Sequence, residues 1–117
     1  MTPAPVKDTV SIDDIDKLDI RVGSIISVTE VTKSEKLMKL TVDFGDHQRS
    51  ILAGIKTERE NPQEIAGKQA LFVLNLPPRK MAGELSEGML FDIGYADGLT
   101  PCLCVPEFSK PNGARAG

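Results

Sequence analysis

The stretch LMKLTVDFGDHQRSIL, residues 37 to 52, determines our prediction of the fold. Apolar and polar residues alternate from Met38 to Phe44, as they do in a strand with one buried and one solvent-facing side. The pair Gly45-Asp46 then favours a tight turn, and residues 48 to 52 supply a returning strand. We therefore expect an antiparallel β-hairpin here, with one face in the core of the domain.

Further strands are expected on both sides of this hairpin. Residues 19 to 31 are rich in β-branched side chains, and Gly23 among them indicates a bulge or a sharp bend. A nearly continuous apolar run at residues 69 to 76 is typical of a strand buried on both faces or at a subunit contact. Additional strands are predicted at residues 89 to 93 and 99 to 105. We therefore expect five or six strands in all.

Two short helices complete the predicted secondary structure. The first follows Ser11, whose hydroxyl can cap a helix that has aspartates in its first turn. The second lies between the third and fourth strands, with Asn61 as its cap, Pro62 in its first turn and Gly67 after its end. This order of elements predicts an all-β domain with the OB-fold, a five-stranded Greek-key barrel, and an SH3-like barrel remains the alternative.

Length and composition fit one small domain. The chain has 117 residues, of which 40% are hydrophobic and 26% charged, and no run approaches the roughly 20 apolar residues of a membrane span. Residues 1 to 10 contain two prolines and few apolar side chains, which indicates a flexible arm before a domain of residues 11 to 117. Because the first residues do not resemble a signal peptide, we expect a cytoplasmic protein without membrane contact.

The acidic charge is concentrated at the start of the chain. The net charge is −3, and the first 19 residues, with five aspartates and two lysines, account for all of it. The remaining residues are neutral overall, so a basic patch can still form where lysines and arginines converge in space. This composition excludes an indiscriminate polycation but leaves a selective nucleic-acid binder open.

The sequence lacks the motifs of common catalytic and metal sites. Its one histidine, His47, lies in the predicted turn, and no phosphate-binding glycine loop or G-x-G-x-x-G pattern occurs. Cys102 and Cys104 are too close for a comfortable bridge within one strand and lack further metal ligands, so we expect reduced thiols. We therefore predict a protein that is not an enzyme and that needs neither a metal nor a cofactor.

The segment NLPPRKMAGELSEGML, residues 75 to 90, carries polar groups that could recognise a ligand. Its two prolines stiffen the exit from a buried strand, so two adjacent cations project from a rigid loop. Such cations bind phosphates, while amides and hydroxyls form hydrogen bonds to the edges of bases or riboses. Adjacent basic residues can also serve solubility alone, and a methionine here can belong to the core. The residues concerned are Asn75, Arg79, Lys80, Ser86 and Met89.

Several segments, in this order, resemble the tRNA-binding domain family. The resemblance extends over residues 11 to 117, through DIRVG at 19 to 23, EKL at 35 to 37, VDFG at 42 to 45, ILAGI at 51 to 55, the segment 75 to 90 and PNG at 111 to 113. The family includes stand-alone bacterial tRNA-binding proteins, the C-terminal domain of many methionyl-tRNA synthetases and CsaA-type export chaperones.

The resemblance implies a homodimeric OB-fold that binds the corner of the folded, L-shaped tRNA without catalysis. An aminoacyl-tRNA synthetase would then be a further candidate partner. Arg21 also matches the family, but its place in a strand favours a structural ion pair with a nearby acid. The few aromatic residues fit readout of a prefolded RNA better than stacking along a single strand. The RNA-facing positions implied for this chain are Lys36, Asn75, Arg79, Lys80, Ser86 and Met89.

The same resemblance leaves a second function open, that of a CsaA-like export chaperone, which binds extended peptides of an unfolded preprotein. The segment ILAGI at residues 51 to 55 favours RNA, because the chaperone branch carries a more polar Gln-Ser-Ser stretch there. The Gly-Met pair at residues 88 to 89 also matches the RNA-binding branch. We therefore rank tRNA binding first.

Overall fold

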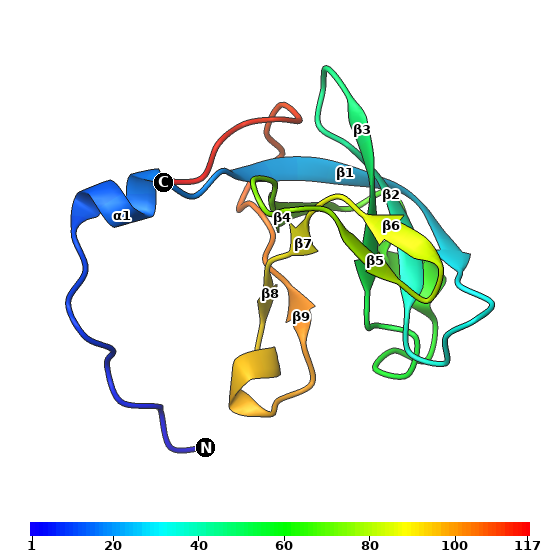
Figure 1. The fold of residues 1–117 in the computed structure, drawn as a ribbon, viewed down its shortest axis with the longest axis horizontal. Coiled ribbons are helices and arrows are strands. Elements are labelled where there is room, and N and C mark those ends of the chain that lie inside the picture. Colours follow the sequence, from blue (N-terminus) through cyan, green and yellow to red (C-terminus); the bar gives the residue numbers. More distant parts are fainter.

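The computed structural model describes residues 1 to 117 and consists mainly of strands. One antiparallel sheet contains β1 (Ile20–Glu30), β2 (Met38–Asp43), β3 (Gln48–Ala53), β4 (Gln69–Val73) and β7 (Met89–Leu90), in the order β3-β2-β1-β4-β7 (Figure 1). Two separate hairpins are formed by β5 (Arg79–Met81) with β6 (Glu84–Ser86) and by β8 (Asp92–Ile93) with β9 (Cys102–Leu103). The helices are α1 (Ile12–Asp16) and the 3₁₀ turns η1 (Pro62–Ile65) and η2 (Tyr95–Asp97).

β1 is the central strand, and its curvature lets it pair with different partners along its length. Its first half pairs with β4 and its second half with β2, and the register with β2 shifts between Ile25 and Ser27. The predicted irregularity is therefore present, slightly beyond the glycine. Gly23 itself is needed for close packing, because a Cβ atom there would lie 2.5 Å from Val42 Cγ1 and 2.7 Å from the Phe44 ring.

The sheet closes into a barrel where β3 meets the link between β6 and β7. The amide of Glu87 donates to the carbonyl of Ser50 at 2.8 Å, and the amide of Ser50 donates to the Glu87 carboxylate at 3.2 Å. The Arg49 guanidinium donates to the carbonyls of Leu74 and Glu87, at 2.9 and 3.0 Å. This five-stranded, nearly closed barrel confirms the predicted OB-fold.

The core fills the inside of the barrel. Thirteen buried residues from all sides of the barrel form one cluster, and within it the rings of Phe44 and Phe72 meet edge to face, with centroids 5.6 Å apart. η1 covers one end through Ile65, which is fully buried. The helix predicted near residue 61 is thus present, as a short 3₁₀ turn, and the Asn61 side chain makes no capping hydrogen bond.

The C-terminal segment pairs with the first part of β1, which does not pair with β2. The Asn112 side-chain oxygen accepts hydrogen bonds from the Ser24 hydroxyl at 2.8 Å and the Gln69 amide at 3.0 Å. Backbone hydrogen bonds then join Gly113 and Ala114 to Val22, at 2.7 and 2.8 Å. The turn predicted at residues 111 to 113 is therefore a structural junction between β1, β4 and the end of the chain.

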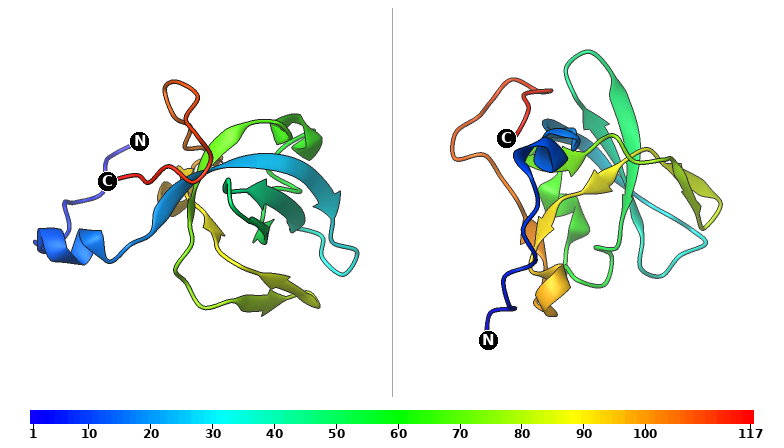
Figure 2. Two further views of the ribbon diagram at one scale, coloured as in Figure 1. Left: turned by 90° about the horizontal axis from the view of Figure 1, so that it is seen from above. Right: turned by 60° about the vertical axis from the view of Figure 1, so that its left-hand side comes forward.

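The N-terminal segment lies outside the barrel. Residues 1 to 10 form no helix or strand and are exposed along their whole length. α1 begins as predicted, because the Ser11 hydroxyl accepts a hydrogen bond from the Asp14 amide while the Asp14 carboxylate accepts one from the Ser11 amide. α1 and the β5–β6 hairpin lie at opposite ends of the molecule (Figure 2). None of the helices has the length or the apolar character needed to cross a bilayer.

The structure differs from the prediction in the last third of the chain. The expected loop at residues 77 to 88 contains the β5–β6 hairpin, whose turn places Ala82 and Gly83 at φ +49° and +80°. The strand expected at residues 89 to 93 is divided between β7 and β8, and the one expected at 99 to 105 is reduced to β9. Strands of two or three residues are too short to produce a periodic pattern in the sequence.

Candidate nucleic-acid interface

The β5–β6 hairpin presents two cations, Arg79 and Lys80, at the surface. Both residues are exposed, and neither side chain makes a hydrogen bond or an ion pair within the chain. The hairpin is anchored to the barrel by an ion pair between Lys39 on β2 and Glu84 on β6, with 3.4 Å between Nζ and Oε1. The two cations are therefore free to bind a ligand while their backbone is held in place.

The loop between β1 and β2 adds two further cations at the same end of the barrel. Lys33 packs on the hairpin turn, since its Nζ and Cδ atoms lie 3.7 Å from where a Cβ atom on Gly83 would be. Lys36 is exposed, and its neighbour Leu37 lines the same groove as Arg79. We call Lys33, Lys36, Arg79 and Lys80 the cationic rim. Lys33 was not among the predicted site residues, although its spacing from Lys36 within one loop was a usable signal.

Ser86 lies inside the protein rather than on the rim. Its side chain is only 3% exposed, and its hydroxyl accepts a hydrogen bond from the Leu52 amide and donates one to the Gly88 carbonyl, both at 3.0 Å. These bonds join β6 to β3 and fix the bend before β7. The hydroxyl is thus engaged within the chain, and its role in the structure is to hold the hairpin.

Asn75 connects the end of β4 with the segment that precedes β1. Its side-chain oxygen accepts from the Asp19 amide at 2.9 Å, and its amide nitrogen donates to the Lys17 carbonyl at 2.6 Å. Asn75 follows the part of β4 that pairs with Ile20, whereas the loop of Lys36 follows the other end of β1. The structure therefore brings Lys36, Arg79 and Lys80 to one end of the barrel and places Asn75 at the other.

We expect Asn75→Ala to loosen the junction between α1 and β1 while leaving RNA affinity within about twofold of wild type. The lost hydrogen bonds should lower the free energy of unfolding by about 1 kcal/mol. Hydrogen exchange of the Asp19 amide should accelerate, which NMR can follow. Asn61→Ala is the matched control, because Asn61 is also exposed and its side chain caps nothing. A tenfold loss of RNA affinity with unchanged stability would instead place Asn75 in direct contact with RNA.

The predicted structural ion pair of Arg21 is confirmed. Its guanidinium donates to both carboxylate oxygens of Asp19, at 2.7 and 3.2 Å. This hydrogen bonding lowers the pKa of the Asp19 carboxyl below its ordinary value of 3.8. The ion pair links the start of β1 to Asp19, whose backbone amide is hydrogen-bonded to Asn75. The Arg21 side chain is therefore engaged within the chain.

The low pKa of Asp19 predicts a loss of stability in acid. Because the pKa is lower in the folded than in the unfolded chain, the stabilisation is present at neutral pH and is lost as the pH falls through the folded value. Denaturant unfolding should give a lower free energy of unfolding at about pH 3 than at pH 7. In Arg21→Met this difference between the two pH values should be smaller. Lys68→Met, at an exposed lysine with no ion pair, should behave like wild type. An equal acid sensitivity of Arg21→Met would contradict the assignment.

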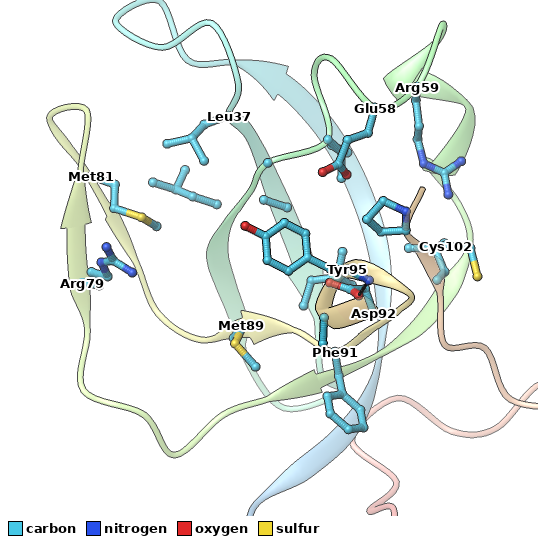
Figure 3. Close-up of a pocket in the computed structure, with 18 residues that line it drawn as sticks. Leu37, Glu58, Arg59, Arg79, Met81, Met89, Phe91, Asp92, Tyr95 and Cys102 are labelled. Atoms are coloured by element: carbon cyan, nitrogen blue, oxygen red, sulfur yellow. Dashed lines mark hydrogen bonds between the residues drawn. The ribbon is translucent and has the colours of Figure 1, made fainter. Parts of the chain in front are cut away.

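A groove of about 530 Å³ lies beside the cationic rim. It separates the β5–β6 hairpin from η2 and the β8–β9 hairpin, and twelve of its eighteen lining residues are hydrophobic (Figure 3). Arg79, Met81 and Met89 line it on the side of β5 and β7, and Tyr95 points into it from η2. Met89 is 46% exposed, so it belongs to this groove and not to the core.

The structure thus defines a class of protein, an OB-type barrel with a cationic surface next to an apolar groove. No histidine, cysteine, aspartate or glutamate side chains gather in a group of three or more that could hold a metal ion. Residues 20 to 115 match the family model described as "Putative tRNA binding domain". The chain therefore belongs to the tRNA-binding domain family.

Individual relatives agree with this family. The chain is 38% identical over 112 residues to the methionine–tRNA ligase of Nitrosomonas europaea, covering 96% of this chain but only 16% of the ligase. A solved structure of a MetRS-related protein from Pyrococcus horikoshii superposes with a TM-score of 0.86 at 34% identity, covering 95% of this chain and 100% of that one. The chaperone CsaA from Bacillus anthracis superposes with a TM-score of 0.81 at 29% identity, over 94% and 100% of the two chains.

Proposed function

We propose that this protein is a non-catalytic, structure-selective tRNA-binding protein. The observation that supports this most is the cationic rim, because its four exposed cations have no internal partners and lie on two segments that are distant in sequence but meet at the hairpin turn. Phosphate contacts from such a cluster position an RNA backbone without reading its sequence. Of the residues that the family resemblance implies, we assign Lys36, Arg79, Lys80 and Met89 to RNA contact, and Asn75 and Ser86 to support of the scaffold.

A folded RNA is a better ligand for this surface than a single strand. Binding along a single strand uses a row of aromatic side chains, whereas this chain has five aromatic residues and the core takes up Phe44 and Phe72. The three at the surface, Phe91, Tyr95 and Phe108, are few for such a row. The rim combines charge with an adjoining groove, which suits the shape of a prefolded RNA. The acidic residues of α1 lie at the other end of the molecule, where they repel the RNA least.

We propose that a second copy of the chain binds to the outer face of the β8–β9 hairpin. Ile93, Val105 and Phe108 are 55%, 57% and 64% exposed along this hairpin and the segment after it. Ile93 alternates with Asp92, which lines the groove, so Ile93 faces away from the groove. A dimer would offer two cationic rims to one large RNA and multiply weak contacts.

Sedimentation at micromolar concentration tests the dimer. The wild-type protein should sediment as a dimer, a species with twice the chain mass of 12.7 kDa. Ile93→Lys should sediment as a monomer, because burial of the new ammonium group in an apolar interface is unfavourable. A wild-type protein that is monomeric under these conditions would contradict the dimer.

An accessory role in aminoacylation fits the relatives. The chain spans about one sixth of the length of the methionine–tRNA ligases it matches, and it corresponds to a domain of these enzymes. We propose that it supplies tRNA affinity to a synthetase in the cytoplasm, with the synthetase as its protein partner.

The apolar groove supports a second candidate function. A CsaA-like chaperone would use such a groove for extended peptides of an unfolded preprotein, and CsaA proteins share this fold. This candidate does not need the cationic rim, whereas RNA binding does. Peptide binding should therefore be insensitive to salt.

A gel shift with folded and with heat-denatured tRNA tests the proposed function. Folded tRNA should bind with at least about tenfold higher affinity, because the rim and groove recognise a shape that denaturation removes. Equal affinity for both forms would indicate general attraction to polyanions. An absence of binding to either form would contradict tRNA binding altogether.

A further inference from the structure

We infer that the groove beside the cationic rim takes up one unstacked nucleobase that carries an exocyclic amino group, and that guanine fits it best. The inference rests on the proposed function, because the base would belong to the RNA whose phosphates lie on the rim. It goes beyond phosphate binding, since it gives the surface a preference among bases. Three features of the groove support it.

The first feature is its size and apolar lining next to a phosphate-binding cation. A volume of about 530 Å³ is within the range of small-ligand sites and accommodates a nucleoside. Arg79 belongs both to the rim and to the groove wall. One nucleotide could therefore place its phosphate on Arg79 and its base between the apolar walls.

The second feature is an exposed aromatic side chain on a hydrogen-bonded turn. Tyr95 is 70% exposed, and its ring points into the groove, across from Met81 and Arg79 (Figure 3). Its amide donates to the Asp92 carboxylate at 3.2 Å, and its carbonyl accepts from the Gly98 amide at 3.1 Å. These bonds fix the backbone that carries the ring at the groove, and a base that stacks on an aromatic ring contributes about 1 to 3 kcal/mol.

The third feature is a hydrogen-bond acceptor without a donor. The Glu58 carboxylate lines the groove and makes no hydrogen bond or ion pair, because the neighbouring Arg59 pairs with Glu64 at 2.6 Å. Burial and the charge of Asp92 raise the pKa of the Glu58 carboxyl above its ordinary value of 4.5. A partly buried carboxylate of this kind is stabilised by a ligand that supplies N–H donors.

The chemistry of the bases then gives a ranking. Guanine presents two N–H donors side by side, at N1 and N2, which match the two oxygens of one carboxylate. Adenine and cytosine present one exocyclic amino group each, and uracil presents none. We therefore expect the groove to prefer guanine, then adenine and cytosine, and to bind uracil most weakly.

NMR titration with nucleoside monophosphates tests this ranking directly. Tyr95 is the chain's single tyrosine, and there is no tryptophan, so its ring signals are easy to assign. Saturable upfield shifts of these signals, from a stacked base, are expected with GMP at about tenfold lower concentration than with UMP. Glu58→Gln should remove most of this difference. Equal shifts with GMP and UMP, or none with either, would overturn the inference.

Variants of Tyr95 connect the groove to tRNA binding. Tyr95→Leu should weaken tRNA binding by about 5-fold to 150-fold, from the loss of stacking, with an unchanged salt slope. Tyr95→Phe keeps the aromatic face and should retain wild-type affinity. If tRNA binds with the expected salt dependence but Tyr95→Leu binds as tightly as wild type, the inference is wrong and the proposed function stands. If wild type binds no tRNA and an apolar peptide shifts the Tyr95 signals instead, both are wrong.

Discussion

Replacing Arg79 and Lys80 together with alanine is expected to weaken tRNA binding by about 30-fold at 0.1 M salt. With roughly four phosphate contacts on the rim, the logarithm of the wild-type affinity should fall with the logarithm of salt at a slope of roughly −3, and removal of two contacts should halve it. The electrostatic contribution vanishes near 1 M salt, so a slope change of about 1.5 corresponds to this loss at 0.1 M. Binding measured by fluorescence anisotropy over a salt series gives both quantities.

The stability of this double variant should be unchanged, because neither side chain has a partner within the chain. Lys7→Ala combined with Lys68→Ala is the matched control, since it removes two exposed cations that lie outside the rim. The control should keep the wild-type slope. If it loses as much affinity as the rim variant, the attraction is diffuse and the rim is not the binding site.

Gly113→Ala is expected to destabilise the fold by about 3 kcal/mol, which lowers the melting temperature by roughly 10 °C. Gly113 has φ +91°, and a Cβ atom there would lie 2.4 Å from the Phe44 carbonyl oxygen. The backbone cannot retreat without breaking the hydrogen bonds between the C-terminal segment and Val22. Thermal denaturation followed by circular dichroism measures this effect.

Two other glycines separate the contributions of strain and contact. Gly67 has φ +87° but open space around it, so Gly67→Ala should lower the stability by about 1 kcal/mol through backbone strain alone. Gly54 has neither a positive φ nor a neighbour within 4 Å, so Gly54→Ala should be nearly neutral. A Gly113→Ala variant no less stable than Gly67→Ala would show that the close approach to Phe44 can relax.

The long, periodic parts of the fold were predictable from the sequence. Alternation in residues 37 to 52 and the β-branched run before it are properties of one strand at a time, and both appear as predicted in β1, β2 and β3. The β5–β6 and β8–β9 hairpins have strands of two or three residues, which carry no period. Their positions depend on the barrel behind them.

The candidate site was predictable only in part. The charges of Arg79 and Lys80 and the stiff entry to their segment were visible in the sequence, and both side chains are exposed. The structural roles of Asn75 and Ser86 were not visible, because their backbone partners lie 56 and 34 residues away in the chain. The groove is formed by segments from five parts of the fold, so no single stretch of sequence contains its signal.

Parallel binding measurements with folded tRNA and with an extended apolar peptide, each from about 0.05 to about 0.3 M salt, test most directly whether this surface is an RNA-binding site. We predict saturable tRNA binding that weakens with salt at a slope of roughly −3, and peptide binding that is much weaker. Salt-insensitive peptide binding without measurable affinity for tRNA would contradict the RNA assignment and identify the groove as the working surface of a chaperone.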